Sequence, residues 1–231
     1  HIDTNVDKSD TLPEDEHFQG IPLDSGSLWL VRTQADGALQ GIRAGGGIFL
    51  VGEQLIIYTA HEYPTANEIY IRIGQIFESW DDFSGLVTHE RKSHGDQGYD
   101  LRGPKGSEIT GKRRLLFKTR TGKSGRGFAK ADLILYDEAQ HLHPEHIAGS
   151  GPAKLANPNS QSWWSGSGGL ASSGPAWEMR RQALLGTGGR LSYTEHTAET
   201  WKILPDGQIL WTPPDPENVD AWYLANPGLG R

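Results

Sequence analysis

Two adjacent acidic residues that directly follow a short apolar run offer the clearest chemistry in this sequence. Asp137 and Glu138 come after Leu133–Tyr136, which has the length and apolar character of a buried strand. If that strand belongs to a parallel sheet, both carboxylates lie at its carboxyl edge, where ligands of open α/β sheets bind. This is the form of a Walker B motif, in which the first acid holds Mg2+ and the second deprotonates the attacking water. A solvated strand end has the same pattern, so the surrounding sequence must decide between the two.

A second candidate motif for nucleotide binding is incomplete. Gly122, Lys123 and Ser124 are similar to the end of a P-loop, but Phe117 stands where that pattern needs its first glycine. The motif also lies too close to Asp137 to leave room for the helix that follows a P-loop. We therefore interpret it as part of a basic loop.

The basic residues are concentrated in one segment, between Ile109 and Ala131, which contains no acidic residue. The eight members are Lys112, Arg113, Arg114, Lys118, Arg120, Lys123, Arg126 and Lys130. Because the chain has a net charge of −7, the remainder carries −15 once these eight charges are removed. Such a run is either an ordinary solvated face or a surface for DNA phosphates. In the second case Lys112, Arg113 and Arg114 would bind DNA.

Three histidines follow the acidic pair, at His141, His143 and His146. Imidazole is a common zinc ligand, but this spacing matches no metal-binding motif. The two interpretations are a zinc site and a solvated loop, and the sequence favours the loop.

Composition restricts the class of protein. The 231 residues are 35% hydrophobic and 22% charged, which suffices for the core of a globular domain. The absence of cysteine excludes disulfides, thiolate metal sites and a cysteine nucleophile. No apolar run reaches ~18 residues, and the acidic N-terminus lacks the pattern of a signal peptide, so we expect a soluble protein. We expect residues 1–26 to be an acidic, flexible segment and residues 27–231 to form one domain.

The hydrophobic pattern predicts short strands that alternate with helices. Strands are expected at 28–31, 55–58, 114–118, 133–136, 162–164 and 191–197, and helices at 65–77, at 176–185 and from 215 onward. Thr65 and Glu68 have the spacing of a capping box for the first helix. Residues 84–111 are expected to form hairpins or loops, and Pro205–Gly207 a turn. This alternation favours an α/β fold with a mainly parallel sheet flanked by helices.

Five short elements resemble, in the same order, those of phage terminase large subunits. They are Ile56–Glu62, Thr119–Phe128, Asp137–Gln140, Trp163–Ser167 and Ala221–Gly230. The resemblance covers about residues 28 to 231. It implies a P-loop NTPase-like packaging ATPase domain of the ASCE type, with ATP and Mg2+ as cofactors.

The resemblance also implies roles for individual residues. Asp137 would be the metal-associated acid and Glu138 the catalytic glutamate. Ser165, Gly166 and Ser167 would form the motif that couples nucleotide state to DNA movement.

Arg126 lies in the Gly-Arg-Gly-Phe element upstream of Asp137, where related packaging motors carry an arginine finger. In that role it would stabilise the charge that develops on the transferred phosphoryl group of a neighbouring subunit's ATP. Apart from the resemblance, a solvated surface arginine is the simpler interpretation.

The P-loop departs from the family's pattern. Its counterpart is Arg32–Ala38, in which Arg32, Gln34 and Gly37 are the nucleotide-binding candidates. Asp36 occupies the place of the Walker A lysine, where a carboxylate would repel the β and γ phosphates. Ala35 replaces a glycine that lets backbone N–H groups approach the phosphates. Arg32 could supply the missing positive charge.

The resemblance implies ATP-driven translocation of double-stranded DNA into a procapsid, in the cytoplasm of the infected bacterium. The implied partners are DNA, a small terminase subunit, the portal protein and further copies in a ring, with no membrane. The nuclease half found in family members is expected to be absent. One alternative is a pseudo-ATPase that acts as a DNA-binding or assembly module, which Asp36 favours. A helicase would need a second motor domain, for which the chain is too short.

Overall fold

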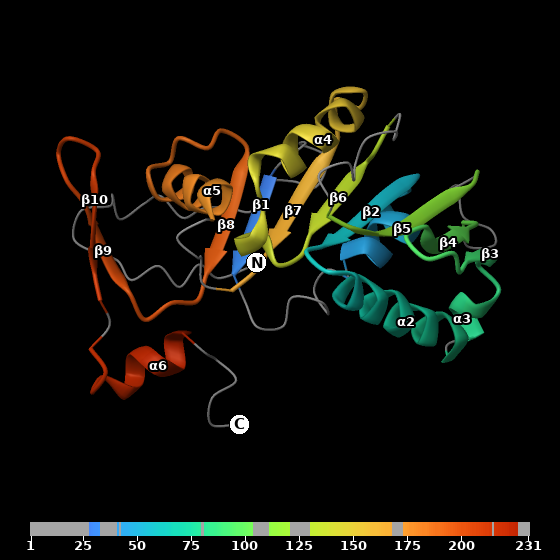
Figure 1. Ribbon diagram of the computed structural model, residues 1–231, viewed down its shortest axis with the longest axis horizontal. Helices are drawn as coiled ribbons and strands as arrows, with labels where there is room; N and C mark the ends of the chain where they lie inside the picture. The colour runs from blue at the N-terminus through green and yellow to red at the C-terminus, as the bar shows by residue number, and fades with distance from the viewer. Residues whose placement is uncertain are drawn as a thin grey trace.

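The computed structural model describes residues 28–32, 41, 43–79, 81–103, 111–120, 130–167, 173–213 and 215–225. Within these residues the chain forms an eight-stranded sheet in the order β3-β4-β5-β2-β6-β7-β1-β8, and a separate two-stranded sheet (Figure 1). The strands of the large sheet are β1 (Leu28–Arg32), β2 (Leu55–Ala60), β3 (Val87–Arg91), β4 (Gln97–Leu101), β5 (Arg113–Thr119), β6 (Leu133–Tyr136), β7 (Gln161–Ser165) and β8 (Leu191–Glu195).

Most of the large sheet is parallel. Strands β5, β2, β6, β7, β1 and β8 run in one direction, and β4 and β3 are added at one edge as an antiparallel hairpin. This confirms the predicted α/β class. Strand β6 lies near the middle of the sheet, between β2 and β7, and β1 is the next strand beyond β7.

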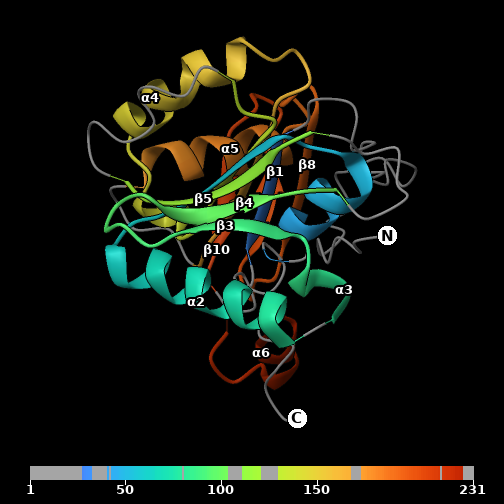
Figure 2. The same ribbon diagram turned by 90° about the vertical axis from the view of Figure 1, so that its right-hand side faces the viewer.

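Helices cover both faces of the sheet. Helices α2 (Tyr63–Ser79) and α3 (Asp81–Ser84) lie on one face, and α4 (Pro144–Leu155) and α5 (Gly174–Leu184) lie on the other (Figure 2). Side chains of β2 alternate between the two cores: Leu55 and Ile57 pack with α4 and α5, whereas Ile56 and Tyr58 pack with α2. Because strands of such a sheet are buried on both faces, they are continuous apolar runs in the sequence.

The first long helix begins earlier than the capping-box prediction. Helix α2 starts at Tyr63, and the amide of Ala66 already donates to the carbonyl oxygen of Glu62 at 3.2 Å. Thr65 is therefore inside the first turn and does not cap the helix. Pro64 stands in the same turn, where its fixed φ and missing N–H are tolerated.

The C-terminal part of the described chain forms a hairpin and a short helix. Strands β9 (Thr200–Ile203) and β10 (Ile209–Thr212) pair antiparallel around the predicted turn, and α6 (Val219–Ala225) follows (Figure 1). The amide of Ala221 donates to Asn218 Oδ1 at 3.2 Å, so Asn218 caps this helix. Asp215, the predicted cap, instead accepts from the Glu217 amide in the preceding turn at 2.9 Å.

Two helical segments were not predicted. Residues 43–46 are helical and continue into the π-helical turn η1 (Gly47–Val51) before β2. Helix α4 occupies the region expected to be a loop after the acidic pair. No helix in the described part of the chain is long and apolar enough to cross a membrane.

Candidate active site

The acidic pair stands at the carboxyl end of a central strand. Strand β6 ends at Tyr136, and the Asp137 amide continues the ladder by donating to the Thr59 carbonyl oxygen of β2 at 2.9 Å. Asp137 is 6% exposed, so its position is set by the sheet and not by solvent. Both acids are therefore at the edge where ligands of such sheets bind, as the sequence predicts.

The carboxylate of Asp137 joins the ends of three neighbouring strands. Its Oδ2 accepts a hydrogen bond from the hydroxyl of Tyr58 in β2. Its Oδ1 accepts from Ser165 Oγ, at the end of β7, at 3.4 Å, and from the Glu138 amide at 2.9 Å. Burial and the neighbouring carboxylate of Asp137 raise the pKa of Tyr58, so its hydroxyl remains a donor.

Glu138 has an unusual backbone conformation. Its φ of 50° and ψ of 51° are left-handed, and in the described part of the chain it is the only non-glycine residue with positive φ. Its carbonyl oxygen accepts from the His141 amide at 2.9 Å, and its Oε2 accepts from the His61 amide at 3.3 Å. This conformation costs ~1–2 kcal/mol for an L-residue, so contacts around Glu138 must hold it in place.

The main contact is Arg120, which the sequence placed only in the basic segment. Its guanidinium donates to the carbonyl oxygens of Thr59 at 2.9 Å, Asp137 at 2.5 Å and Glu138 at 3.1 Å. Burial lowers the pKa of Arg120 to about 10, against the opposing effect of Glu138 and Asp137, so it stays charged at neutral pH. The sequence signal that could have indicated this role is the position of Arg120 directly after β5, because β5 ends at the edge of the sheet that carries Asp137.

The motif after β7 packs tightly against the loop after β6. A Cβ on Gly166 would lie 2.4 Å from Gln140 Oε1 and 2.9 Å from the Ala139 nitrogen, so only glycine fits there. Ser165 is fully buried beside Asp137, whereas Ser167 is exposed. The predicted coupling motif thus divides into a buried hydroxyl that contacts Asp137 and an exposed one.

The predicted phosphate-binding residues are only partly described. Gln34, Gly37 and Asp36, which stands in the place of the Walker A lysine, lie outside the described residues, as does Arg126. The backbone of Arg32 is described, at the carboxyl end of β1, opposite Glu195 of β8. In the neighbouring pair Val31 stands opposite Ser165. The chain therefore enters the P-loop counterpart beside the strand that contacts Asp137.

Among its described residues, the basic segment exposes less positive charge than the sequence indicates. Lys112 and Arg114 are exposed, but Arg113 is 2% exposed and its Nη1 donates to the Gly111 carbonyl oxygen at 2.9 Å. Lys118 pairs with Asp96 at 2.7 Å. The pleat of β5 turns Arg113 into the protein and Arg114 outward, so of the three candidates for DNA binding Lys112 and Arg114 are the exposed ones. Lys112, Arg113 and Arg114 lie at the amino end of β5, opposite the edge that carries Asp137, whereas Lys118 is near its carboxyl end.

The three histidines do not form a metal site. His143 caps the start of α4 and His146 lies in its first turn, where the His143 amide donates to His146 Nδ1 at 3.2 Å. The ring of His141 stacks on His61 with centroids 4.5 Å apart. Burial and the charge of Arg120 lower the pKa of His146. No group of three metal-ligating side chains occurs among the described residues, and the predicted loop is a helix.

The residues around Asp137 fit a Mg2+ ion. Asp137 supplies carboxylate oxygens and Ser165 a hydroxyl oxygen beside them, and oxygen is the ligand type that Mg2+ prefers. Oδ2 accepts a hydrogen bond from the Tyr58 hydroxyl, and a carboxylate oxygen has a second lone pair that could accept from a metal-bound water. Asp137 is thus the residue that would hold the ion.

The fold is similar to those of solved phage large terminases. The HK97 bacteriophage large terminase superposes with a TM-score of 0.66 at 15% identity, covering 88% of this chain and 40% of that one. A mutant ATPase domain of the large terminase from Thermus phage P74-26 superposes with a TM-score of 0.54 at 12% identity, covering 74% of this chain and 76% of that one. No family model and no curated protein matches the sequence. This chain, which spans 40% of the HK97 protein, has the fold of the ATPase domain of phage large terminases.

Proposed function

We propose that this chain is the ATPase portion of a phage terminase large subunit, which hydrolyses ATP to move double-stranded DNA into a procapsid. The observation that carries the proposal is the contact of Ser165 with Asp137, next to Glu138, at the carboxyl edge of a sheet with this fold. In the motor, copies of the chain would form a ring on the portal, and a small terminase subunit would deliver the DNA. The setting would be the cytoplasm of the infected bacterium.

The conformation of Glu138 supports a catalytic role for its carboxylate. Asparagine or glycine would adopt a φ of 50° at lower cost, so a glutamate there lowers stability unless its side chain is needed. Strained backbone of this kind is concentrated at functional sites. Glu138 would accept the proton of the water that attacks the γ phosphate.

The roles proposed for Asp137 and Arg120 rest on their positions in the structure, and those proposed for Arg32, Gln34, Gly37 and Arg126 rest on the resemblance of the sequence. Asp137 would hold Mg2+, which neutralises charge on the phosphates when bound. Arg120 keeps the Asp137 and Glu138 carbonyl groups in place and thereby fixes the Glu138 side chain. Arg32, with Gln34 and Gly37, would bind the phosphates. Arg126 would act as an arginine finger toward the ATP of a neighbouring copy.

The second candidate function is a pseudo-ATPase that serves as a DNA-binding or assembly module. The observation that favours it is Asp36, an acid in the place of the Walker A lysine. Retention of Glu138 in a costly conformation argues against it, because a site that no longer hydrolyses ATP has no use for that carboxylate.

Turnover of ATP in the presence and absence of Mg2+ tests the proposal. We expect Mg2+-dependent hydrolysis by the wild-type chain. Glu138→Gln should retain ATP binding and lose at least about 100-fold in kcat, because an amide cannot accept the proton. Glu145→Gln, which neutralises an exposed acid at the start of α4, is the matched control and should hydrolyse ATP normally.

An inactive wild-type chain would require a second variant. Asp36→Lys with Ala35→Gly restores the charge and backbone freedom of a P-loop. Recovery of turnover would identify the P-loop as the defect in an otherwise complete site. Continued inactivity of the folded double variant would overturn the ATPase proposal and favour the pseudo-ATPase.

A further inference from the structure

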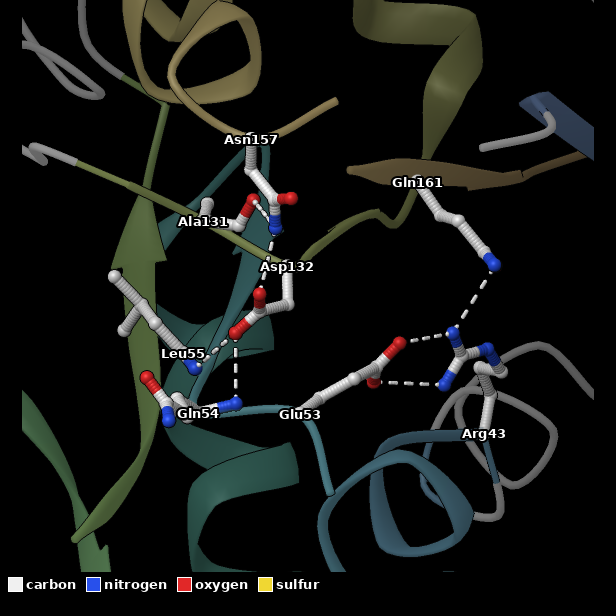
Figure 3. Close-up of polar contacts among 8 residues, drawn as sticks. All are labelled: Arg43, Glu53, Gln54, Leu55, Ala131, Asp132, Asn157 and Gln161. Carbon is white, nitrogen blue, oxygen red and sulfur yellow. Dashed lines mark hydrogen bonds and ion pairs between the residues drawn. The ribbon is translucent and has the colours of Figure 1, made fainter. Parts of the chain in front are cut away.

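A buried ion pair attaches the helical segment 43–51, which follows β1, to the sheet. The attachment is at the amino end of β7, and Asp137 lies at the opposite edge of the sheet. Arg43 Nη1 and Nη2 donate to the two carboxylate oxygens of Glu53 at 2.9 and 2.6 Å, and Nη2 also donates to Gln161 Oε1 at 3.1 Å (Figure 3). We call Arg43, Glu53 and Gln161 the clasp. Its members come from the helical segment, the residues before β2 and the first position of β7.

Stability alone does not explain the clasp. The side chains of Arg43 and Glu53 are 5% and 9% exposed, so both charges have lost most of their hydration. Replacing such a buried pair by apolar residues is often neutral or stabilising, and its best-attested use is to specify one arrangement. The forked guanidinium is suited to this, because it makes several bonds in a fixed geometry.

The turn between the two charges is shaped for the clasp. A Cβ on Gly47 would lie 1.9 Å from Glu53 Oε2 and 2.6 Å from Arg43 Nη1, so a larger residue would displace the ends of both side chains. The Glu53 amide also donates to the Gly47 carbonyl oxygen at 2.9 Å. Glycine at this position therefore lets the pair close across the π-helical turn.

Strand β7 connects the clasp to the candidate active site. Gln161 is its first residue and is 2% exposed, and Ser165, which contacts Asp137, is its last. Four steps of ~3.3 Å separate the two by about 13 Å. One end of β7 therefore holds the helix that follows the P-loop counterpart, and the other end holds the metal-associated acid.

We propose that Arg43 is a positioning residue that holds this helix in register with β7, the strand whose other end contacts Asp137 through Ser165. The inference rests on the proposed ATPase function for its effect on catalysis. The attachment of the helix itself can be measured without nucleotide.

A neighbouring network provides a matched control. Asp132 Oδ2 accepts from the amides of Gln54 and Leu55 at 2.7 and 2.9 Å, and its Oδ1 accepts from Asn157 Nδ2 at 2.6 Å (Figure 3). This network lies at the same edge of the sheet and fastens the starts of β2 and β6. It makes no hydrogen bond to Arg43, so its loss should not release the helix.

The experiment combines amide hydrogen exchange with ATPase kinetics in the full chain. Gln161→Met removes the bond to β7 and leaves the Arg43–Glu53 pair intact, so this variant should fold even if Arg43→Gln does not. Both variants should raise exchange at residues 43–51 at least about tenfold, since a hydrogen bond to a charged group is lost. They should also lower kcat/KM by about 10- to 100-fold, mainly through KM. Asp132→Ala should raise exchange at Gln54 and Leu55 and leave KM unchanged.

Three results would overturn the inference: unchanged exchange at 43–51 in Gln161→Met, an equal rise throughout the domain, or faster exchange at 43–51 with KM unchanged. A wild-type chain without turnover would defeat the proposed function. The exchange measurement would then still decide whether the clasp holds the helix.

Discussion

Replacing Arg120 by methionine removes the group that fixes the backbone of the acidic pair. Arg120 is 5% exposed, and its guanidinium donates to the carbonyl oxygens of Thr59, Asp137 and Glu138. Methionine keeps much of the volume but leaves these carbonyls without their charged donor. Hydrogen bonds to charged groups contribute ~1.5–3 kcal/mol each and are not additive, so we expect a loss of about 3–5 kcal/mol in the free energy of unfolding.

Thermal and urea denaturation, followed by tryptophan fluorescence, measure this loss. For a domain of this size each kcal/mol corresponds to about 2–4 °C, so Tm should fall by roughly 6–20 °C. Arg114→Met is the control, because it removes an exposed arginine from the adjacent strand β5 and should change stability by less than about 0.5 kcal/mol. A fall in ATP turnover well below the new Tm should accompany the loss, since Glu138 is no longer held in its left-handed conformation.

A stability loss under about 1 kcal/mol would refute this reasoning, because the carbonyls would then have found equivalent partners. Unchanged turnover in the folded variant would separately refute the claim that Arg120 positions Glu138. Equal losses for Arg114→Met would show that the effect comes from charge and not from burial.

Two further predictions concern the buried glycine after β7 and the exposed basic residues at the start of β5. Gly166→Ala should lower stability by about 1–3 kcal/mol and slow turnover, because the added Cβ would collide with Gln140 and Ala139; a variant as stable and active as the wild type in melting and turnover assays would be inconsistent with that packing. Neutralising Lys112 and Arg114 together, with Gln at both positions, should weaken binding to all DNA sequences alike and flatten its dependence on salt, as fluorescence anisotropy titrations would measure. Unaltered affinity would assign these charges to ordinary solvation.

The central strands could be predicted because they are buried on both faces. Residues 55–58 and 133–136 are continuous apolar runs, and both lie within strands of the observed sheet. Helix α4 could not be predicted because its local sequence disfavours a helix and only contacts with distant residues stabilise it. It contains Gly149, Gly151 and Pro152, which oppose a helix locally, but Ala153 and the adjoining Ile147 pack on the sheet and stabilise it.

The sequence by itself determined where the carboxylates of the candidate site would stand. A short apolar run followed by Asp137 and Glu138 ends at the carboxyl edge of a parallel sheet whatever the remaining loops do, because side chains at a strand end inherit their place from the strand. The order of the motifs likewise indicated the ATPase fold that the comparisons show.

Only the tertiary structure decided which basic residues are buried, and that Arg120 is the one that contacts the acidic pair. Arg113 and Arg120 are indistinguishable from their exposed neighbours in a run of basic residues, yet both are buried and bonded to backbone carbonyls. The sequence also gave no indication of the left-handed backbone of Glu138 or of the contact between Ser165 and Asp137. Burial and the choice of hydrogen-bond partner depend on residues far apart in the chain, which local pattern and propensity do not register.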